Sequence, residues 1–279
     1  MRVIRAIVRV AAVLSTTVCA AQASKEKESD SAKQRQEKRM DLMRGRVQAL
    51  SAMGQGDETL EFSAEPLLRY NDLARDVADA SLWAVGRKGR PRALLVVEVY
   101  WKEDFVHYEF TGVAEPPRLV RGAFFEWKPR AAPFTWLKLE GEAPPHATQG
   151  IRRRQIRQAA EKFSASEEWR GQTSQLRLMP QPILQYEDKE KGVIEGAVFV
   201  WAHGTNVEIL MYLEGRQGED GAKHWACGFG QLSGADLDVD YNGQDFWNSS
   251  QGAAASRSRS YFGLKVPLTA AEREAFAPQ

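Results

Sequence analysis

Apolar and polar residues alternate over one stretch of the chain in a way that predicts a β-hairpin. Apolar side chains recur there at every second position, at Val207, Ile209, Met211 and Leu213. This spacing places them on one face of a β-strand. The preceding run, Gly196–Ala202, is almost wholly apolar, and Gly-Thr-Asn at 204–206 is a turn signal. Two short apolar runs around a turn are typical of paired antiparallel strands.

The same pattern occurs a second time. Leu60–Glu98 aligns with Leu176–Glu214 at a shift of 116 residues, without a gap and with eight identities. Average composition would give roughly two or three identities over this length. The identical pairs include Pro66 with Pro182, Tyr70 with Tyr186, Asp72 with Asp188 and Glu98 with Glu214. The alignment therefore predicts two copies of one structural unit.

A helix is predicted at the start of each copy. Apolar residues recur at helical spacing at Met40, Met43, Val47 and Leu50, and again at Ile156, Ala159, Ala160 and Phe163. The predicted fold is α+β and mainly antiparallel β, with pseudo-repeats at 40–145 and 146–247. Each repeat has one helix plus about five strands. The two form either a sandwich-like pair or a curved half-barrel with the helices on one side.

The two ends of the chain differ from the repeats. Residues 1–23 have three arginines, a short apolar core and an Ala-Gln-Ala site, the order of a secretory signal peptide. We therefore predict a secreted or periplasmic protein whose mature chain has no transmembrane span. Residues 24–39 read as a charged tether and 248–260 as a flexible linker. A strand and a short helix are predicted over 261–279, where Thr269 and Glu272 fit a capping box.

Charge and cysteine content narrow the function classes. The chain has 38 Lys and Arg and 37 Asp and Glu, and three of the arginines lie in the predicted signal peptide. The mature chain would therefore be slightly acidic, which argues against a dedicated nucleic-acid-binding protein. Of the two cysteines, only Cys227 would remain. The mature chain could then form no internal disulfide, and its apolar core must hold the fold.

Two repeat-related carboxylates are candidates for catalysis. If both sheets faced one cavity, Glu98 and Glu214 could act as general acid and base, with His107 and His224 near them. The alternative is that each glutamate ends an apolar strand at the rim, where it is solvated or paired with arginine. No nucleophile elbow, phosphate-binding loop or dinucleotide fingerprint is present in the sequence, so no cofactor is predicted.

One segment resembles a calcium-binding loop. Asp238, Asp240, Asn242 and Gly243 match the start of such a loop, but Ser249 stands where a bidentate glutamate is needed. The neighbouring apolar residues alternate like those of a strand, and Asn-Gly is a strong hairpin signal. We therefore favour a hairpin with exposed aspartates over a metal site.

A resemblance to a known family adds to this picture. The segments Leu176–Trp201 and Gly204–Glu214, with Gly89-Arg90-Pro91, Arg154–Arg157 and Phe163–Ala165, resemble a family of uncharacterised secreted proteins of planctomycete bacteria. The resemblance covers most of residues 60–247 and implies export, but no particular reaction. The first function hypothesis is an exported, non-catalytic protein that binds a small ligand or an envelope component. The second is a secreted hydrolase that uses Glu98 and Glu214.

Overall fold

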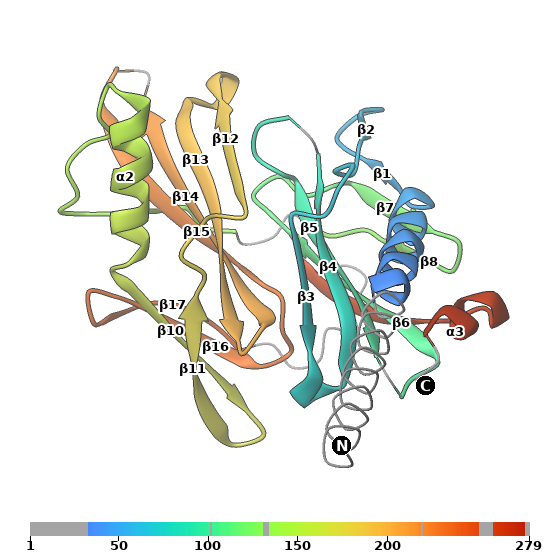
Figure 1. Cartoon of the computed structure of the whole chain (residues 1–279). Helices are drawn as coiled ribbons and strands as arrows, with labels where there is room; N and C mark the ends of the chain where they lie inside the picture. Colours follow the sequence, from blue (N-terminus) through green and yellow to red (C-terminus); the bar gives the residue numbers. More distant parts are fainter. Residues whose placement is uncertain are drawn as a thin grey trace, which may run out of the picture.

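The computed structural model describes residues 33–86, 88–100, 102–130, 134–218, 220–250 and 259–276, with side chains up to 273. Antiparallel β-sheet dominates this part of the chain, as the alternation of apolar residues predicts (Figure 1). The predicted signal peptide lies outside the described residues. The predicted tether over 24–39 is described only from residue 33, and from there to residue 48 the chain is helical. No described helix is both long and apolar enough to cross a bilayer.

The first half of the chain builds two sheets. The larger one is a meander of β3 (Leu68–Asp72), β4 (Val77–Val85), β5 (Ala93–Tyr100) and β6 (Phe105–Gly112), extended beside β6 by the late strand β18 (Tyr261–Pro267). The smaller one has the order β2-β1-β7-β8, from β1 (Ser51–Met53), β2 (Thr59–Leu60), β7 (Leu119–Gly122) and β8 (Phe125–Trp127). A 3-10 turn, η1 (Leu73–Arg75), joins β3 to β4.

The second half begins with the short strand β9 (Leu137–Lys138) and helix α2 (Gln149–Ala160). Its meander consists of β12 (Leu184–Asp188), β13 (Val193–His203), β14 (Asn206–Gln217) and β15 (Lys223–Gln231), with η2 (Lys189–Lys191) between the first two strands. Four more strands follow the order β11-β10-β16-β17, from β10 (Phe163–Trp169), β11 (Gln172–Leu178), β16 (Asp236–Tyr241) and β17 (Gln244–Ser249). β11 also pairs with β13, so these strands form one nine-stranded sheet with the meander and β9.

The two meanders share one strand register at a shift of 116 residues. Ala80 pairs with Glu98 across β4 and β5, and Gly196 pairs with Glu214 across β13 and β14. Irregularities fall at equivalent places, between Val77 and Asp79 and between Val193 and Glu195. The turns η1 and η2 also occupy equivalent positions. Residues that align in the sequence therefore occupy equivalent places in the two meanders.

Each half is larger than the predicted unit of one helix and about five strands. Of the described strands, β1–β8 and β18 form the sheets of the first half, and β9–β17 form the sheet of the second half. The described strands make four antiparallel groups, a propeller-like arrangement of four blades, and not the predicted sandwich-like pair or curved half-barrel. The prediction missed the β2-β1-β7-β8 group because its strands of two to four residues are too short to show alternation.

Both faces of each meander are buried, which explains their near-continuous apolar sequences. Alternate residues of the first meander, such as Trp83 and Leu95, pack beneath the helix at 33–48, and Phe199 and Ile209 of the second pack beneath α2. The intervening residues of both meanders form a shared core, which includes Leu82, Leu94, Val96, Val198, Leu210 and Tyr212. Each fully buried side chain of this size stabilises the fold by roughly 1.5–3 kcal/mol. The halves thus pack through the inner faces of β4, β5, β13 and β14.

The end of the chain is attached to the first half. β18 pairs along the whole length of β6, from Tyr261 opposite Thr111 to Pro267 opposite Phe105. Helix α3 (Ala270–Phe276) follows. The backbone N–H of Thr269 donates to Glu272 at 2.7 Å, and the backbone N–H of Glu272 donates to the Thr269 hydroxyl at 3.3 Å. This is the reciprocal pair of a capping box. Residues 251–258 of the predicted linker lie outside the described residues.

Candidate functional site

An acidic cleft opens at one end of the shared core, between the two halves. It has a volume of about 260 Å³ and is lined by residues of β5, β6, β10, β14 and η1, together with the segment after β15. Four glutamates are among its described lining residues: Glu98, Glu109, Glu167 and Glu208. All four are at least nine-tenths buried. We use the name acidic cleft for the cavity bounded by these four side chains.

Glu98 lies on the inner face of β5 and accepts hydrogen bonds from two tyrosines. The Tyr70 hydroxyl is 3.1 Å from Oε1, and the Tyr100 hydroxyl is 2.8 Å from Oε2. Nδ1 of His107, which pairs with Glu98 across β5 and β6, lies 3.3 Å from Oε2. Burial disfavours the imidazolium, but the hydrogen bond to Glu98 and the charge of Glu109 outweigh it, so the pKa of His107 is raised. Burial and the charge of Glu98 raise the pKa of Tyr100, which therefore stays a neutral donor.

Glu109 is the most strongly perturbed acid of the cleft. It follows His107 by two residues on the same face of β6 and accepts a hydrogen bond from the Tyr261 hydroxyl at 2.6 Å. Burial, reinforced by the charges of Glu98 and Glu208, raises the pKa of Glu109 to about 8. The opposing influences of His107 and the Tyr261 hydroxyl do not cancel this effect. Near neutral pH, Glu109 therefore holds its proton in the absence of a cation.

Three of these residues have the spacing of metal ligands. One ligand atom each from Glu98, His107 and Glu109 lies within 4.8 Å of the other two. Carboxylate oxygens with one imidazole nitrogen are a donor set suited to divalent cations such as Mn²⁺ and Zn²⁺.

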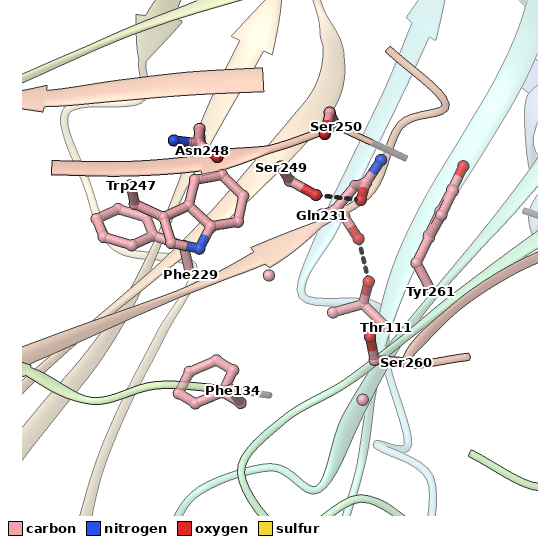
Figure 2. Close-up of a pocket in the computed structure, with 12 residues that line it drawn as sticks. Thr111, Phe134, Phe229, Gln231, Trp247, Asn248, Ser249, Ser250, Ser260 and Tyr261 are labelled. Carbon is pink, nitrogen blue, oxygen red and sulfur yellow. Dashed lines mark hydrogen bonds between the residues drawn. The ribbon is translucent and has the colours of Figure 1, made fainter. Parts of the chain in front are cut away.

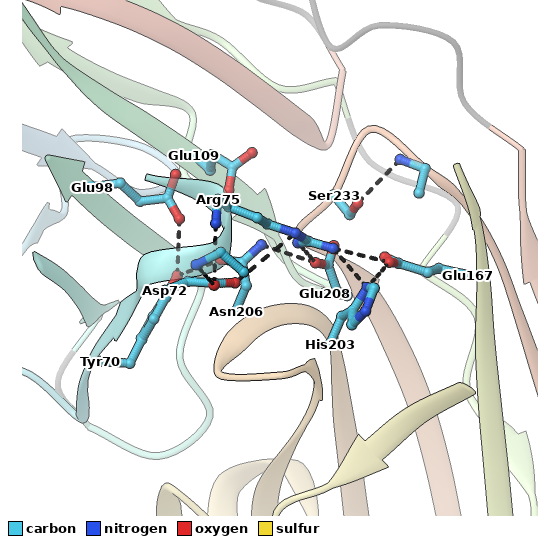
Figure 3. Close-up of polar contacts among 12 residues, drawn as sticks. Tyr70, Asp72, Arg75, Glu98, Glu109, Glu167, His203, Asn206, Glu208 and Ser233 are labelled. Atoms are coloured by element: carbon cyan, nitrogen blue, oxygen red, sulfur yellow. Dashed lines mark hydrogen bonds and ion pairs between the residues drawn. The ribbon is translucent and has the colours of Figure 1, made fainter. Parts of the chain in front are cut away.

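The second half contributes Glu167 from β10 and Glu208 from β14, which Arg75 of η1 bridges (Figure 3). Arg75 Nη2 donates to Glu167 at 3.0 Å, and Arg75 Nη1 donates to Glu208. His203 also contacts Glu167. Burial raises the pKa of Glu208, and the charge of Glu167 adds to this, although Arg75 opposes it. Arg75 is the only Lys or Arg among the described lining residues, so acidic groups outnumber basic ones in the cleft.

An exposed aromatic side chain lies beside these carboxylates. Trp169 of β10 lines the cleft and is 51% exposed, one of few large apolar side chains on the described surface. Tyr100 lines the same cavity. Aromatic rings attract cations to their faces, most strongly when the ring is tryptophan. The cleft thus combines negative charge with aromatic surface.

Glu214, the counterpart of Glu98, lies in an arrangement that we call the closed site. Its carboxylate is fully buried and accepts hydrogen bonds from Arg90 Nε at 2.6 Å and Arg90 Nη2 at 2.7 Å. Arg216 Nε donates to it at 2.8 Å, and the Tyr186 hydroxyl at 2.6 Å. Both guanidinium groups lie over the Trp136 ring, Arg90 at 4.6 Å and Arg216 at 3.9 Å from its centroid.

The two predicted catalytic glutamates therefore do not meet in one cavity. Glu98 lines the acidic cleft together with Glu208. Glu214 follows Glu208 by six residues on β14, about 20 Å along an extended strand. The alternative prediction placed each glutamate at the rim, solvated or paired with arginine. Glu214 is paired with arginine, but it is fully buried within β14 and not at the rim, and Glu98 contacts tyrosines and a histidine instead.

The predicted match between His107 and His224 does not hold in the strand register. His107 is opposite Glu98, whereas His224 is opposite Arg216 and not Glu214. Ala226 is the residue opposite Glu214. The sequence alignment beyond the hairpin is therefore displaced by two residues, because the loop after β14 is longer than its counterpart.

The calcium-like motif lies in a hairpin. Asp238 and Asp240 belong to β16 and pair with Ser166 and Ser164 of β10. Asn242 and Gly243 have φ values of 52° and 74°, as a two-residue turn between β16 and β17 requires. Ser249 stands at the position where a calcium loop needs its glutamate. It belongs to β17 and pairs with Leu237 of β16. The motif thus runs along strands instead of wrapping around an ion.

A second cavity is lined in part by Tyr261, whose hydroxyl donates to Glu109 of the cleft (Figure 2). It also measures about 260 Å³ and is lined by aromatic side chains, among them Phe134, Phe229 and Trp247. At its wall, the Ser249 hydroxyl donates to Gln231 Oε1 at 2.8 Å, and the Thr111 hydroxyl donates to the Gln231 carbonyl. Its described lining contains no Asp, Glu, Lys, Arg or His. Of these two cavities, only the acidic cleft has charged side chains in its described lining.

Comparison with protein-family models, curated proteins and solved structures finds no match to this chain.

Sequence reasoning identified Glu98 and His107 but missed most of the cleft. Arg75, Glu109, Glu167 and Glu208 come from separate elements, and no local spacing connects them. A signal was present in the alignment at a shift of 116: Arg90 corresponds to Asn206, Arg92 to Glu208 and Arg216 to Tyr100. The two arginines that contact Glu214, Arg90 and Arg216, are thus replaced by the neutral residues Asn206 and Tyr100 in the cleft, and Glu208 stands at the position of Arg92, which pairs with Glu58 and Glu115 outside the closed site.

Proposed function

We propose that the protein binds a small cation in the acidic cleft and performs no chemistry on it. The observation that carries the proposal is a cavity of about 260 Å³ with four buried glutamates and a single arginine among its described lining residues. Burying an unpaired carboxylate is costly, and a bound cation removes the cost. Arg75 compensates Glu167 and Glu208, which leaves Glu98 and Glu109 with hydroxyl donors and one histidine.

Export and the internal repeat are part of this proposal. The basic and apolar order of residues 1–23, together with the resemblance to secreted planctomycete proteins, supports a secreted or periplasmic binding protein. The common register of the two meanders supports descent of both halves from one unit. In this view, one copy of the site became closed and the other became the binding cleft.

Calorimetric titration of the purified protein tests the function. Mn²⁺, Ca²⁺ and organic cations are titrated at constant ionic strength into the wild type and into Glu98→Gln. Glu140→Gln is the matched control, because Glu140 is 78% exposed and lies outside the cleft. We expect at least one cation class to bind, with an affinity that falls by about tenfold or more in Glu98→Gln only. Equal binding by all three proteins would refute the cleft as the site.

A hydrolase is the second candidate, and the raised pKa of Glu109 favours it. A protonated Glu109 beside Glu98 could serve as general acid, with Glu98 as base or nucleophile. Glu109 replaces Glu214 in this version of the hypothesis. A screen of glycoside, ester and peptide substrates tests it. An activity that disappears in both Glu98→Gln and Glu109→Gln would make hydrolysis the better description.

A further inference from the structure

The closed site is an internal example of how this fold binds a guanidinium group. Arg90 comes from the first half, before β5, and its guanidinium contacts Glu214 of the second half through two N–H···O bonds of 2.6 and 2.7 Å. Tyr186 donates to the same carboxylate. Such two-point contacts between guanidinium and carboxylate are among the strongest hydrogen bonds in proteins. With Arg90 7% exposed and Glu214 fully buried, the pair is desolvated.

The acidic cleft has the same glutamate and tyrosine as the closed site but lacks the guanidinium. Glu98 is in the register position of Glu214, and Tyr70 donates to Glu98 as Tyr186 donates to Glu214. The residue that corresponds to Arg90 is Asn206, which approaches from the opposite half as Arg90 does: its Oδ1 lies 3.2 Å from the Tyr70 hydroxyl. The shorter, neutral Asn206 cannot supply the charge that Arg90 supplies to Glu214. In the cleft, residue 206 therefore provides no guanidinium at the position that Arg90 fills in the closed site.

The other replacements change the charge in the same direction. Glu208 corresponds to Arg92, and Tyr100 corresponds to Arg216. Where the closed site brings two guanidinium groups to one carboxylate, the cleft has additional carboxylates and an aromatic hydroxyl. Glu109, 8% exposed, has Tyr261 as its only hydrogen-bond donor among the described residues. These differences favour an external cation over an internal one.

We propose that the acidic cleft binds the guanidinium or primary ammonium group of a small organic cation, seated on Glu98 as Arg90 is seated on Glu214. This inference rests on the proposed cation-binding function and specifies the class of ligand. Tyr70 orients the carboxylate, Glu208 supplies further negative charge, and a bound cation favours the ionised form of Glu109 (Figure 3). Trp169, half exposed beside these groups, offers its ring to the cation or to the carbon chain that carries it. A cavity of about 260 Å³ accommodates a head group with a short chain.

A divalent metal ion on Glu98, His107 and Glu109 is the competing occupant. Metal ligation needs the His107 nitrogen, whereas a guanidinium on Glu98 does not. A metal ion also makes no use of Tyr70, Asn206 or the exposed Trp169. The test therefore separates the two occupants by their dependence on different side chains.

Agmatine is the probe, with N-butylurea as a neutral counterpart and Mn²⁺ as the metal. Calorimetry and tryptophan fluorescence are measured on the wild type, Glu98→Gln, His107→Gln and Asn206→Arg. Asn206→Arg places in the cleft the guanidinium that the closed site already has. Gln172→Arg, which adds the same charge on an exposed position of β11, is its control.

We expect agmatine to bind the wild type, His107→Gln and Gln172→Arg, and to bind Glu98→Gln and Asn206→Arg at least about tenfold more weakly. N-butylurea should bind the wild type no better than it binds Asn206→Arg. Asn206→Arg should also unfold at a higher temperature than the wild type. If Asn206→Arg fails to fold, the Glu98→Gln and N-butylurea comparisons still decide the question.

Two results overturn the inference in different ways. Binding of Mn²⁺ that is lost in His107→Gln, with no binding of agmatine, refutes the organic cation and leaves the cation-binding function in place. Failure of both agmatine and Mn²⁺ to bind refutes the function as well.

Discussion

The buried ion pair of the closed site gives the most direct test of the energetics. Replacing Arg90 with methionine keeps an unbranched side chain of similar length but removes the guanidinium from Glu214, whose carboxylate is fully buried. Removing one partner of a buried pair typically costs about 3–5 kcal/mol, because the remaining charge stays uncompensated. Arg216 and Tyr186 still donate to Glu214. We therefore expect a loss near the lower end, about 3 kcal/mol in the free energy of unfolding.

Urea unfolding at neutral pH, followed by tryptophan fluorescence and circular dichroism, measures this loss. The double variant Arg90→Met with Glu214→Leu should regain a large part of it, because apolar groups can replace a buried ion pair at little cost. Glu98→Gln is the matched comparison, since the amide oxygen can still accept from one of the two tyrosine hydroxyls and the amide N–H can donate to the other. It should cost less than about 1 kcal/mol, because the neutral amide removes the cost of burying a charge at this position. An effect of Arg90→Met below about 1 kcal/mol would show that water compensates Glu214 and would refute the reasoning.

Three further predictions concern other parts of the molecule. In the folded protein the pKa of Glu109 is raised from 4.5 to about 8. Between these two pH values the folded protein binds more protons than the unfolded protein. The free energy of unfolding therefore falls as pH rises, by at most about 1.4 kcal/mol per pH unit. Glu109→Gln should show a shallower decline in urea unfolding between pH 5 and 8.5, and identical slopes would contradict the assignment. Burial raises the pKa of the Cys227 thiol to about 12, so a thiol reagent should label the native protein far more slowly than the urea-unfolded protein. Export should remove residues 1–23, and the intact mass of protein from the producing cell should correspond to a chain that starts at Ser24; a retained Arg2 would contradict this.

The sequence predicted the central part of the fold because the relevant information is local and occurs twice. The alignment of Leu60–Glu98 with Leu176–Glu214 matches the strand register of both meanders, including the pairs of Glu98 and Glu214. The alternation of apolar residues, with the Asn-Gly turn signal, also identified the hairpin of β16 and β17. Short strands such as β1 and β8, with three residues each, were not predicted because their pairing depends on distant segments and not on their own pattern.

The cleft was largely beyond sequence reasoning for a different reason. Arg75 and Glu208 are separated by 133 residues and touch only because the inner faces of the two meanders pack together. The relative orientation of the halves decides that Glu98 is near Glu208 rather than near Glu214, and repeat alignment contains no information about that orientation. The alignment does contain the charge changes between copies, Arg90 to Asn206 and Arg92 to Glu208. Those changes show that the two copies differ in charge at these positions, but they do not show which other residues surround Glu98.

The comparison of the two sites also bears on why the cleft exists. The closed site demonstrates that this fold can satisfy a buried glutamate with an arginine from the opposite half, through Arg90 and Glu214. The same solution was available to Glu98 by an arginine at position 206, and the chain has asparagine there instead. Proteins commonly give up stability at sites that act on other molecules, because the unpaired groups that bind a ligand are unfavourable without it. A purely structural role would favour two closed sites. A glutamate that binds an arginine in one site, and a glutamate that contacts only two tyrosines and a histidine among the described residues in the other, form the pattern expected when the second carboxylate has an external partner. Arg90→Met and Asn206→Arg test the two sides of that argument in opposite directions.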